Sequence, residues 1–455
     1  MIKNNNSYAD GAAGAIGKIH AFEKFGSILG LERMTELLAL LGDPQNKLKV
    51  IHVAGTNGKG SVCRYIYSVL QENGYRAGLY TSPFLEVFNE RIELDGAYIS
   101  DEDLTVYTDR VLEQVQVMVD AGKQSPTEFE VITAIAFLYF YEKGADYVVL
   151  EVGLGGRGDS TNVCKEPLIS VITSISYDHT DRLGSTLAQI AWEKAGIIKD
   201  GCPVVTSAGA PEALEVIERT AAEHGSLFFE TKGIPYRVKS QSLHGSCFDV
   251  DLQGVIFEDL TISMAGEHQI ENAIAALAAI SLLEERGELC IRKEKLYSGF
   301  RKAKQIGRFE VLTAPDAQPV VILDGAHNPD GAKVLRKAVR DFCPQQKILM
   351  VTGMLADKDT AQILECFRDI ADDFIATEPV NPRRMKKEIL KTRLEAAGAR
   401  CITAADAEDA AREAIQYGAD YDVILFAGSL YLIGQVRSIL RGLLADSKTE
   451  GETGV

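Results

Sequence analysis

Short apolar runs alternate along this chain with longer segments that carry apolar residues at helical spacing. In the first half, the runs predict strands at 50–53, 77–80, 147–152, 168–175 and 203–206, and the helical patterns include 28–41, 62–72, 129–141 and 187–197. Alternation of this kind is typical of a mostly parallel sheet with helices on both faces. The first half of the chain is therefore predicted to form a doubly wound α/β domain.

The pattern changes near residue 236. Residues 236–264 alternate in short strands with Asp, Gly and Ser turns, which predicts a small antiparallel appendix before an Ala-rich helix at 271–285. A charged, turn-containing stretch at 297–309 precedes a second α/β series with strands at 320–323, 347–352, 373–376 and 423–427. We predict an N-terminal domain at 1–299, which includes the appendix, and a smaller C-terminal Rossmann-like α/β domain at 300–455.

A glycine-rich segment lies between the first predicted strand and its helix. It reads Ala54, Gly55, Thr56, Asn57, Gly58, Lys59, Gly60 and Ser61. Backbone N–H groups at such a turn can bind phosphate, Lys59 supplies positive charge, and the Ser61 hydroxyl can reach phosphate or Mg²⁺. The segment departs from the strict P-loop motif, because Val53 replaces the first Gly and Gly60 follows Lys59. A plain glycine-rich turn is the alternative, and phosphate binding alone leaves ATPase, kinase and ligase open.

Candidate metal ligands follow other strands of the same predicted sheet. Ser82, Glu151 and the pair Asp178 and His179 come at or just after strand ends, where parallel strands converge on one crevice. A hard cation that bridges ATP phosphates prefers oxygen ligands, so Glu151 is the strongest candidate, whereas a histidine would also suit Mn²⁺. Taken singly, Ser82 could belong to an ordinary turn and His179 could be structural. Spacing alone does not mark Lys194.

Charge and cysteine usage narrow the classes of partner. The formal net charge of −17 argues against nucleic-acid and anionic-membrane surfaces, which need an excess of Lys and Arg. The eight cysteines form no CxxC pair, which favours reduced thiols. The N-terminal stretch lacks the basic start and apolar run of a secretory signal. We expect a cytoplasmic protein that binds small molecules and neither nucleic acid nor membrane.

Eight segments in order then resemble the motifs of the folylpolyglutamate synthases, a family of ATP-dependent amide ligases in the Mur ligase superfamily. The resemblance covers nearly the whole chain. The segments are 55–61, 81–85 with 89–92, 151–157, 178–179, 193–198, 268–273, 307–310 and 324–329. One departure is Ile306, where many relatives have Pro. The resemblance implies ATP-dependent ligation of glutamate to a folate carboxylate through an acyl phosphate.

The resemblance also implies roles for individual residues. Ser61, Ser82, Glu151 and His179 would hold two Mg²⁺ ions, and Lys194 would be carbamylated so that its new carboxylate joins the metal site. Lys59, Lys194 and His179 are the implied catalytic set. ATP would contact residues 55–61 of the glycine-rich segment, here named the phosphate loop, together with Asn272, Arg308, Asp324 and His327. It would therefore lie between the two domains. A monovalent cation such as K⁺ fits the same scheme.

The sequence defines the folate substrate less closely than it defines the ATP and metal residues. The family's folate pocket implies roles for Phe84 and Arg91 in the loop at 81–91 and for Phe129, which could stack on a pterin. The small-molecule substrates would be ATP, L-glutamate and tetrahydrofolate or dihydropteroate, and the enzyme is expected to be a monomer. The alternatives are a dedicated dihydrofolate synthase, another Mur-type amino-acid ligase, and a nucleotide-binding switch protein without ligase chemistry.

Overall fold

The computed structural model of this protein describes residues 11–26, 28–315 and 317–452. Contacts divide the chain into two compact units, Met1–Pro235 with Glu271–Lys302, and Tyr236–Ile270 with Ala303–Val455. The antiparallel segment, which we predicted as an appendix of the N-terminal domain, thus groups with the second unit. The boundary at residue 300 stays a prediction.

The first unit is built on an eight-stranded sheet whose order is β4-β3-β2-β5-β1-β6-β7-β8. Its strands are β1 (Val50–Ala54), β2 (Ala77–Tyr80), β3 (Ile92–Leu94), β4 (Ala97–Tyr98), β5 (Tyr147–Glu151), β6 (Ile169–Ile172), β7 (Val204–Thr206) and β8 (Phe228–Glu230). Strands β2, β5, β1, β6, β7 and β8 are parallel, while β3 and β4 pair antiparallel at one edge. Because β1 lies between β5 and β6, the carboxyl ends of these three strands define one crevice.

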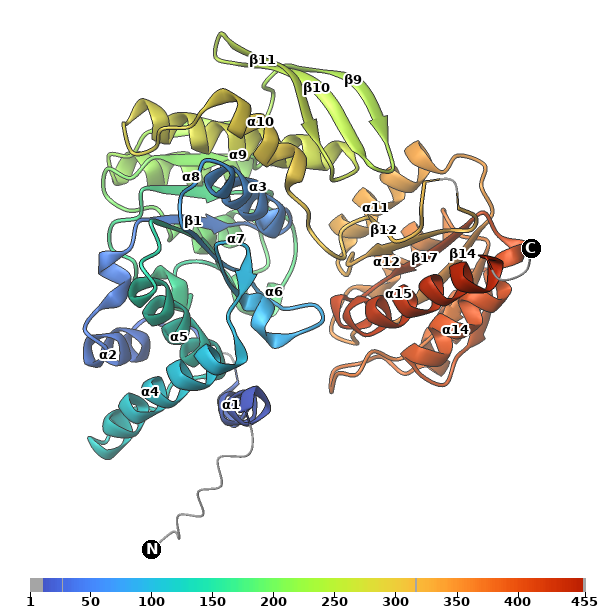
Figure 1. The fold of residues 1–455 in the computed structure, drawn as a ribbon, viewed down its shortest axis with the longest axis horizontal. Helices are drawn as coiled ribbons and strands as arrows, with labels where there is room; N and C mark the ends of the chain where they lie inside the picture. The colour runs from blue at the N-terminus through green and yellow to red at the C-terminus, as the bar shows by residue number, and fades with distance from the viewer. Residues whose placement is uncertain (1–10, 27, 316, 453–455) are drawn as a thin grey trace, which may run out of the picture. The chain divides into compact units, whose positions relative to one another are not determined.

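Helices cover both faces of this sheet, as Figure 1 shows around β1. They are α1 (Gly11–His20), α2 (Glu32–Leu40), α3 (Lys59–Glu72), α4 (Asp101–Asp120), α5 (Glu128–Glu142), α6 (Thr180–Leu183), α7 (Leu187–Ala195), α8 (Pro211–Glu223), α9 (Glu267–Glu285) and α10 (Lys293–Lys302). Side chains of α1, α2, α4 and α5 share one hydrophobic core with β2 and β5. Helix α3 packs on β1, β2 and β5, and α10 packs on α3. The predicted doubly wound fold is confirmed.

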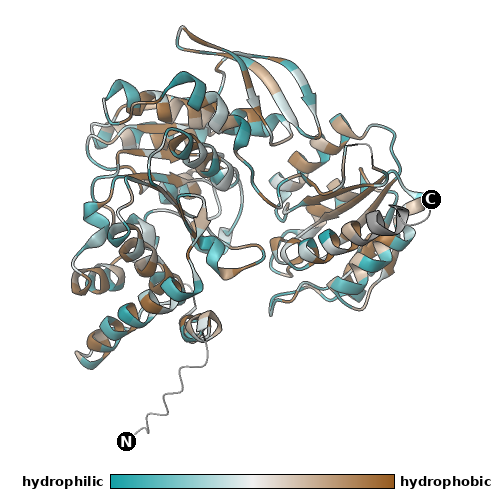
Figure 2. Cartoon of the chain, in the orientation of Figure 1, coloured by the Kyte–Doolittle hydropathy of each residue, from teal (hydrophilic) through white to brown (hydrophobic). Residues whose placement is uncertain are grey.

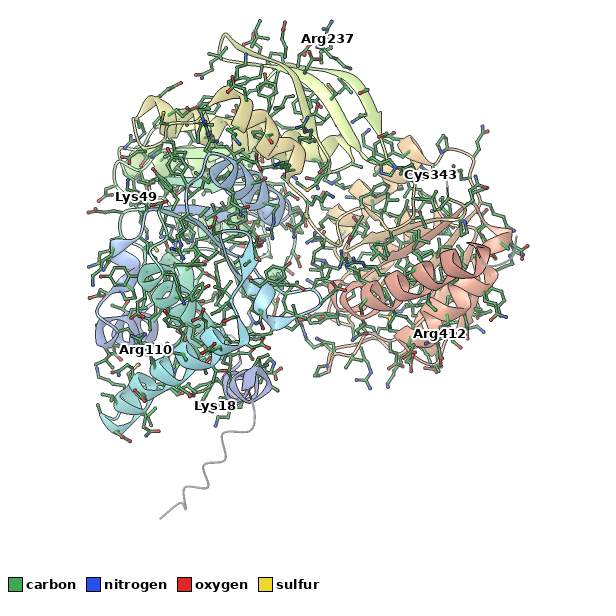
Figure 3. All side chains as sticks on the ribbon, viewed as in Figure 1. Lys18, Lys49, Arg110, Arg237, Cys343 and Arg412 are labelled. Atoms are coloured by element: carbon green, nitrogen blue, oxygen red, sulfur yellow. The ribbon has the colours of Figure 1, made fainter. Side chains whose placement is uncertain are left out.

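Ion pairs join the outer helices of the first unit. Arg110 on α4 donates from both terminal guanidinium nitrogens to Glu142 on α5, each at 2.6 Å, and Lys18 on α1 donates to Asp109 on α4 at 2.6 Å. Arg110 and Lys18 are labelled in Figure 3. Exposed pairs of this type add little stability, so burial of the apolar faces holds these helices in place.

The second unit contains two sheets. Strands β9 (Tyr236–Ser242), β10 (Gly245–Leu252) and β11 (Val255–Ile262) form an antiparallel sheet, as the alternating sequence pattern predicted. The other sheet has the order β12-β13-β17-β14-β15-β16 and is parallel except for β12. Its strands are β12 (Glu310–Val311), β13 (Val320–Asp324), β14 (Ile348–Thr352), β15 (Asp373–Ala376), β16 (Arg400–Thr403) and β17 (Val423–Ala427), and its helices are α11 (Pro329–Phe342), α12 (Thr360–Arg368), α13 (Lys387–Ala396), α14 (Ala407–Tyr417) and α15 (Leu430–Glu452). Figure 2 shows hydrophobic strands at its centre.

The structure corrects the prediction of a turn-containing stretch at 297–309. Helix α10 continues to Lys302, because its Leu296 and Phe300 side chains are buried at helical spacing. Helix α4 and the short strands β3, β4, β8, β12 and β16 were not predicted from the sequence. No helix in the described part of the chain has the length and hydropathy needed to cross a bilayer.

Candidate active site

The loop between β1 and α3 has a defined shape because the end of β6 supports it. Thr173, just beyond β6, donates from Oγ1 to the carbonyl of Asn57 at 2.7 Å. A Cβ at Gly55 would lie 1.8 Å from Thr173 Oγ1, so this position requires glycine. Lys59 begins α3 and donates from Nζ to the carbonyls of Gly55 and Thr56 at 3.1 and 3.2 Å. The loop therefore presents the N-terminus of α3, which favours a phosphate group.

Gly58, the residue before α3, provides a test of this loop. Its φ is +89°, and a Cβ there would lie 2.4 Å from Asn272 Oδ1 on α9. We expect Gly58→Ala to weaken the affinity for an ATP analogue by about tenfold or more, because relieving the clash costs on the order of 1.4 kcal/mol and moves the loop or Asn272. The affinity is measured by calorimetry.

Gly74 offers a matched control, because its φ is +87° and a Cβ there would meet nothing within 4 Å. Gly58→Ala and Gly74→Ala should both lose about 1 kcal/mol of unfolding free energy from the positive φ. Only Gly58→Ala should lose nucleotide affinity. Equal affinities in the two variants would contradict the role of Gly58.

Lys194 lies against the same loop. It sits in the last turn of α7, is buried, and donates from Nζ to the carbonyl of Gly55 at 2.8 Å. Burial, with a further contribution from the positive charge of Lys59, lowers the pKa of Lys194 to about 7. The structure thus brings Lys59 and Lys194 together on one carbonyl, and near neutral pH part of the Lys194 population is an uncharged amine.

Glu151 and Ser82 come together at the neighbouring strand ends. Glu151 ends β5, directly beside Val53 of β1, and its Oε2 accepts a hydrogen bond from the backbone N–H of Ser82 at 3.3 Å. Ser61 lies buried in the first turn of α3. Carboxylate and hydroxyl oxygens are the hard donors that Mg²⁺ prefers, so these residue types fit that ion.

His179, the fourth predicted metal ligand, lies just before α6. It precedes α6 with a φ of +51°, its side chain is 41% exposed, and its Nε2 lies 3.8 Å from Asp178 Oδ1. Within the described residues, no group of three His, Cys, Asp or Glu side chains is placed to hold a metal ion. The ligand role of His179 therefore stays a prediction.

A carboxylate that was not predicted from the sequence, Asp159, organises the loop after Glu151. Asp159 is buried and accepts hydrogen bonds from the backbone N–H of Leu154 at 2.8 Å and of Thr161 at 3.0 Å. Thr161 Oγ1 in turn lies 2.9 Å from Nε2 of His52 in β1. Burial raises the pKa of Asp159, and these hydrogen bonds oppose that rise. Thr173 directly follows β6, and this position was the available signal for finding it.

An arginine and the chain's single tryptophan link this loop to α7. The Arg157 guanidinium lies 3.8 Å from the centre of the Trp192 ring, and the Arg157 backbone N–H donates to the Glu193 carbonyl at 2.7 Å. The Trp192 side chain is 46% exposed. The loop after Glu151 is thereby fixed to the turn of α7 that carries Lys194.

The predicted folate residues occupy two places in the first unit. Arg91 stacks its guanidinium on the rings of Phe84 and Phe88, at 5.2 and 5.4 Å from their centres. Phe129 is in the first turn of α5, and its ring fills the space beside Gly153, where a Cβ would lie 2.4 Å from Phe129 Cζ. Both places contain aromatic groups that could stack on a planar ligand.

The second unit holds the remaining predicted nucleotide contacts. Asp324 ends β13, and its carboxylate accepts hydrogen bonds from the backbone N–H groups of Phe309 and Ala326, both at 2.8 Å. Burial raises the pKa of Asp324, while the positive charge of Arg308 acts in the opposite direction. His327 donates from Nδ1 to the Gly325 carbonyl at 2.7 Å if that nitrogen carries the proton. Asp324 therefore organises the turns that carry Arg308 and His327.

Two protein-family models match separate parts of this chain. Residues 53–280 match the Mur ligase middle domain, and residues 307–430 match the Mur ligase glutamate ligase domain. The dihydrofolate synthase/folylpolyglutamate synthase of Bacillus subtilis is 38% identical over 437 residues, which cover 93% of this chain and 97% of the relative.

Two solved structures are similar over the same length. The folylpolyglutamate synthase of Thermotoga maritima has a TM-score of 0.82 and 37% identity, covering 94% of this chain and 96% of its own. Escherichia coli FolC, in complex with DHPP and ADP, has a TM-score of 0.84 and 29% identity over 96% and 100% of the two chains.

The fold, the phosphate loop and these matches define a ligase with Mur ligase domains, an ATP-dependent class. Within that class, the chain belongs to the folylpolyglutamate and dihydrofolate synthase family.

Proposed function

We propose that this enzyme joins L-glutamate to the terminal carboxylate of a tetrahydrofolate, with cleavage of ATP to ADP and phosphate. Family membership supports this reaction. The structural observation that supports this reaction is the buried Lys194, whose Nζ lies 2.8 Å from the phosphate-loop carbonyl of Gly55. A nucleotide-binding switch protein has no evident need for a lysine of lowered pKa at that point.

The chemistry follows from the weakness of a carboxylate as an acyl electrophile. A folate carboxylate oxygen attacks the γ-phosphorus of ATP, ADP leaves, and an acyl phosphate forms. The glutamate amine then attacks the carbonyl carbon, phosphate leaves, and the amine loses a proton. Lys59 would offset negative charge on the transferring phosphoryl group, and we propose the same role for Arg308.

We assign the metal site to Ser61, Ser82, Glu151 and His179. Bound Mg²⁺ would supply charge neutralisation for the ATP phosphates. Uncharged Lys194 would attack CO₂, forming an N–C bond and releasing one proton, so that the side chain beside the phosphate loop ends in a carboxylate. The lowered pKa of Lys194 supports this modification. A second Mg²⁺ and a monovalent cation such as K⁺ stay predictions.

The remaining assignments concern ATP and folate. We assign ATP contacts to residues 55–61 of the phosphate loop and to Asn272, Arg308, Asp324 and His327. For the folate we assign Phe84, Arg91 and Phe129. The aromatic surroundings of Arg91 and Phe129 support a planar ligand, and Arg91 could also meet a substrate carboxylate.

A second activity is the conversion of dihydropteroate to dihydrofolate by the same ligation. It is favoured by the Bacillus subtilis relative, whose name gives both activities, and by the DHPP complex of the Escherichia coli structure. Both reactions add glutamate to an aryl or glutamyl carboxylate, so one activation site serves both.

The test is a ligation assay with purified protein, MgATP and labelled glutamate, offering tetrahydrofolate and 7,8-dihydropteroate in separate reactions. We expect ADP and a labelled conjugate in stoichiometric amounts with tetrahydrofolate. Conjugate with both acceptors would establish two activities, and conjugate with dihydropteroate alone would make the enzyme a dihydrofolate synthase. ADP formation without conjugate from either acceptor would exclude the proposed function.

A further inference from the structure

The loop at residues 81–91 connects the adjacent strands β2 and β3 and carries three residues assigned above. Its ends are joined, because the backbone N–H of Thr81 donates to the carbonyl of Arg91 at 3.1 Å. Ser82 lies at one end beside Glu151, while Phe84 and Arg91 stack on each other. The shape of this loop therefore decides where the metal side and the folate side of the site meet.

A single carboxylate fills the interior of the loop. Glu90 is 9% exposed, and its Oε2 accepts a hydrogen bond from the backbone N–H of Leu85 at 2.7 Å. Its Oε1 accepts from the backbone N–H groups of Glu86 and Val87, both at 2.9 Å. Three consecutive amides thus converge on one anion. Hydrogen bonds to an ionised acceptor are stronger than neutral ones, and leaving a buried donor unpaired is costly.

The bonded amides lie on the folate side of the loop. They follow Phe84 directly, and they precede Phe88, whose ring centre lies 5.7 Å from that of Phe84. Arg91, the next residue after Glu90, stacks on both rings. The metal side is held separately, through the contact of Ser82 with Glu151. Loss of the Glu90 carboxylate should therefore loosen Phe84 and Arg91 more than Ser82.

We propose that Glu90 is a positioning residue for the folate substrate, which acts by holding Phe84 and Arg91 in their stacked arrangement. This inference rests on the proposed function. Glu90 itself would make no contact with substrate. Within this loop, folate binding would depend on Glu90, whereas nucleotide binding would not.

The test uses Glu90→Ala and Glu90→Gln, with the exposed Glu102 at the start of α4 changed to Gln as a control. Initial rates are measured with folate and ATP varied separately. In Glu90→Ala we expect the folate KM to rise about tenfold or more, since three charge-assisted hydrogen bonds are lost. Glu90→Gln keeps an oxygen for two of the three amides and should show a smaller rise. The ATP KM should stay within about twofold of the wild-type value in all three variants.

Amide hydrogen exchange at Leu85, Glu86 and Val87 reports the contact without any assay of activity. These amides should exchange slowly in the wild type and quickly in Glu90→Ala. If Glu90→Ala does not fold, Glu90→Gln still decides the question through its folate KM. An unchanged folate KM in a folded variant, or an equal rise in both KM values, would overturn the inference. A wild-type protein with slow exchange and no turnover would instead count against the proposed function, leaving the loop geometry intact.

Discussion

Lys194→Ala should abolish ligation while the protein remains folded. We expect turnover to fall by about 100- to 1,000-fold or more, the range seen when one preorganised electrostatic group is removed from an active site. The fold should survive because burial disfavours the charged form of this lysine, and alanine removes that cost. Steady-state turnover and a thermal unfolding curve measure the two quantities.

Lys199 provides the matched control for Lys194. It follows α7 closely, and burial likewise lowers its pKa, but its Nζ faces the Asn162 carbonyl at 3.5 Å and not the phosphate loop. Lys199→Ala should retain turnover within a few-fold. If Lys199→Ala loses as much activity as Lys194→Ala, the specific role of Lys194 is wrong.

The carbamate itself can be observed by ¹³C NMR in ¹³C-bicarbonate. The amine reacts with CO₂ only when uncharged, and its pKa is lowered to about 7. In metal-free protein the carbamate signal should therefore be strong above pH 7, should weaken as the pH falls through that value, and should be missing from Lys194→Ala. A wild-type spectrum without the signal at any pH would count against the modification.

Glu151→Ala should also abolish ligation with the fold retained. Glu151 is the carboxylate at the strand ends beside the phosphate loop, so its loss removes the anionic ligand that we assign to Mg²⁺. We expect turnover at ordinary Mg²⁺ concentrations to fall by about 100-fold or more. Turnover is measured as a function of Mg²⁺ concentration.

Glu151→Gln refines this result, because the amide oxygen can still accept the hydrogen bond from Ser82 while the charge is gone. It should remain as inactive as Glu151→Ala, or require far more Mg²⁺. Glu230→Gln is the control, since Glu230 also ends a parallel strand but is exposed at the edge of the sheet. Normal turnover in Glu151→Gln would overturn the metal assignment.

The main strands could be predicted from the sequence because each is a short apolar run buried on both faces, as β1 and β5 are. Helix α4 could also have been predicted, since Ser100 caps it and Leu104, Tyr107 and Val111 follow at helical spacing. Strands such as β4 and β8 could not be predicted in this way. They have two and three residues, and pairing with a neighbouring strand decides their conformation more than their own sequence does.

The candidate site likewise contains residues that the sequence could predict and residues that it could not. The phosphate loop and Glu151 follow from local sequence and the strand-end rule, and the structure brings both to one crevice. The role that we propose for Lys194 did not follow from spacing, because its pKa depends on burial and on Lys59, which is far away in the sequence. The Glu90 carboxylate was equally hidden, because its contacts depend on the path of the loop backbone.

The stacking of Arg157 on Trp192 gives this enzyme a built-in optical probe. Trp192 is the sole indole in the chain and lies two residues before Lys194, with one face against the loop that follows Glu151 and about half of its surface in water. Indole emission shifts in wavelength and intensity with solvent contact and with a nearby cation. Intrinsic fluorescence can therefore follow rearrangement around Lys194 in real time, without an added label and without background from a second tryptophan.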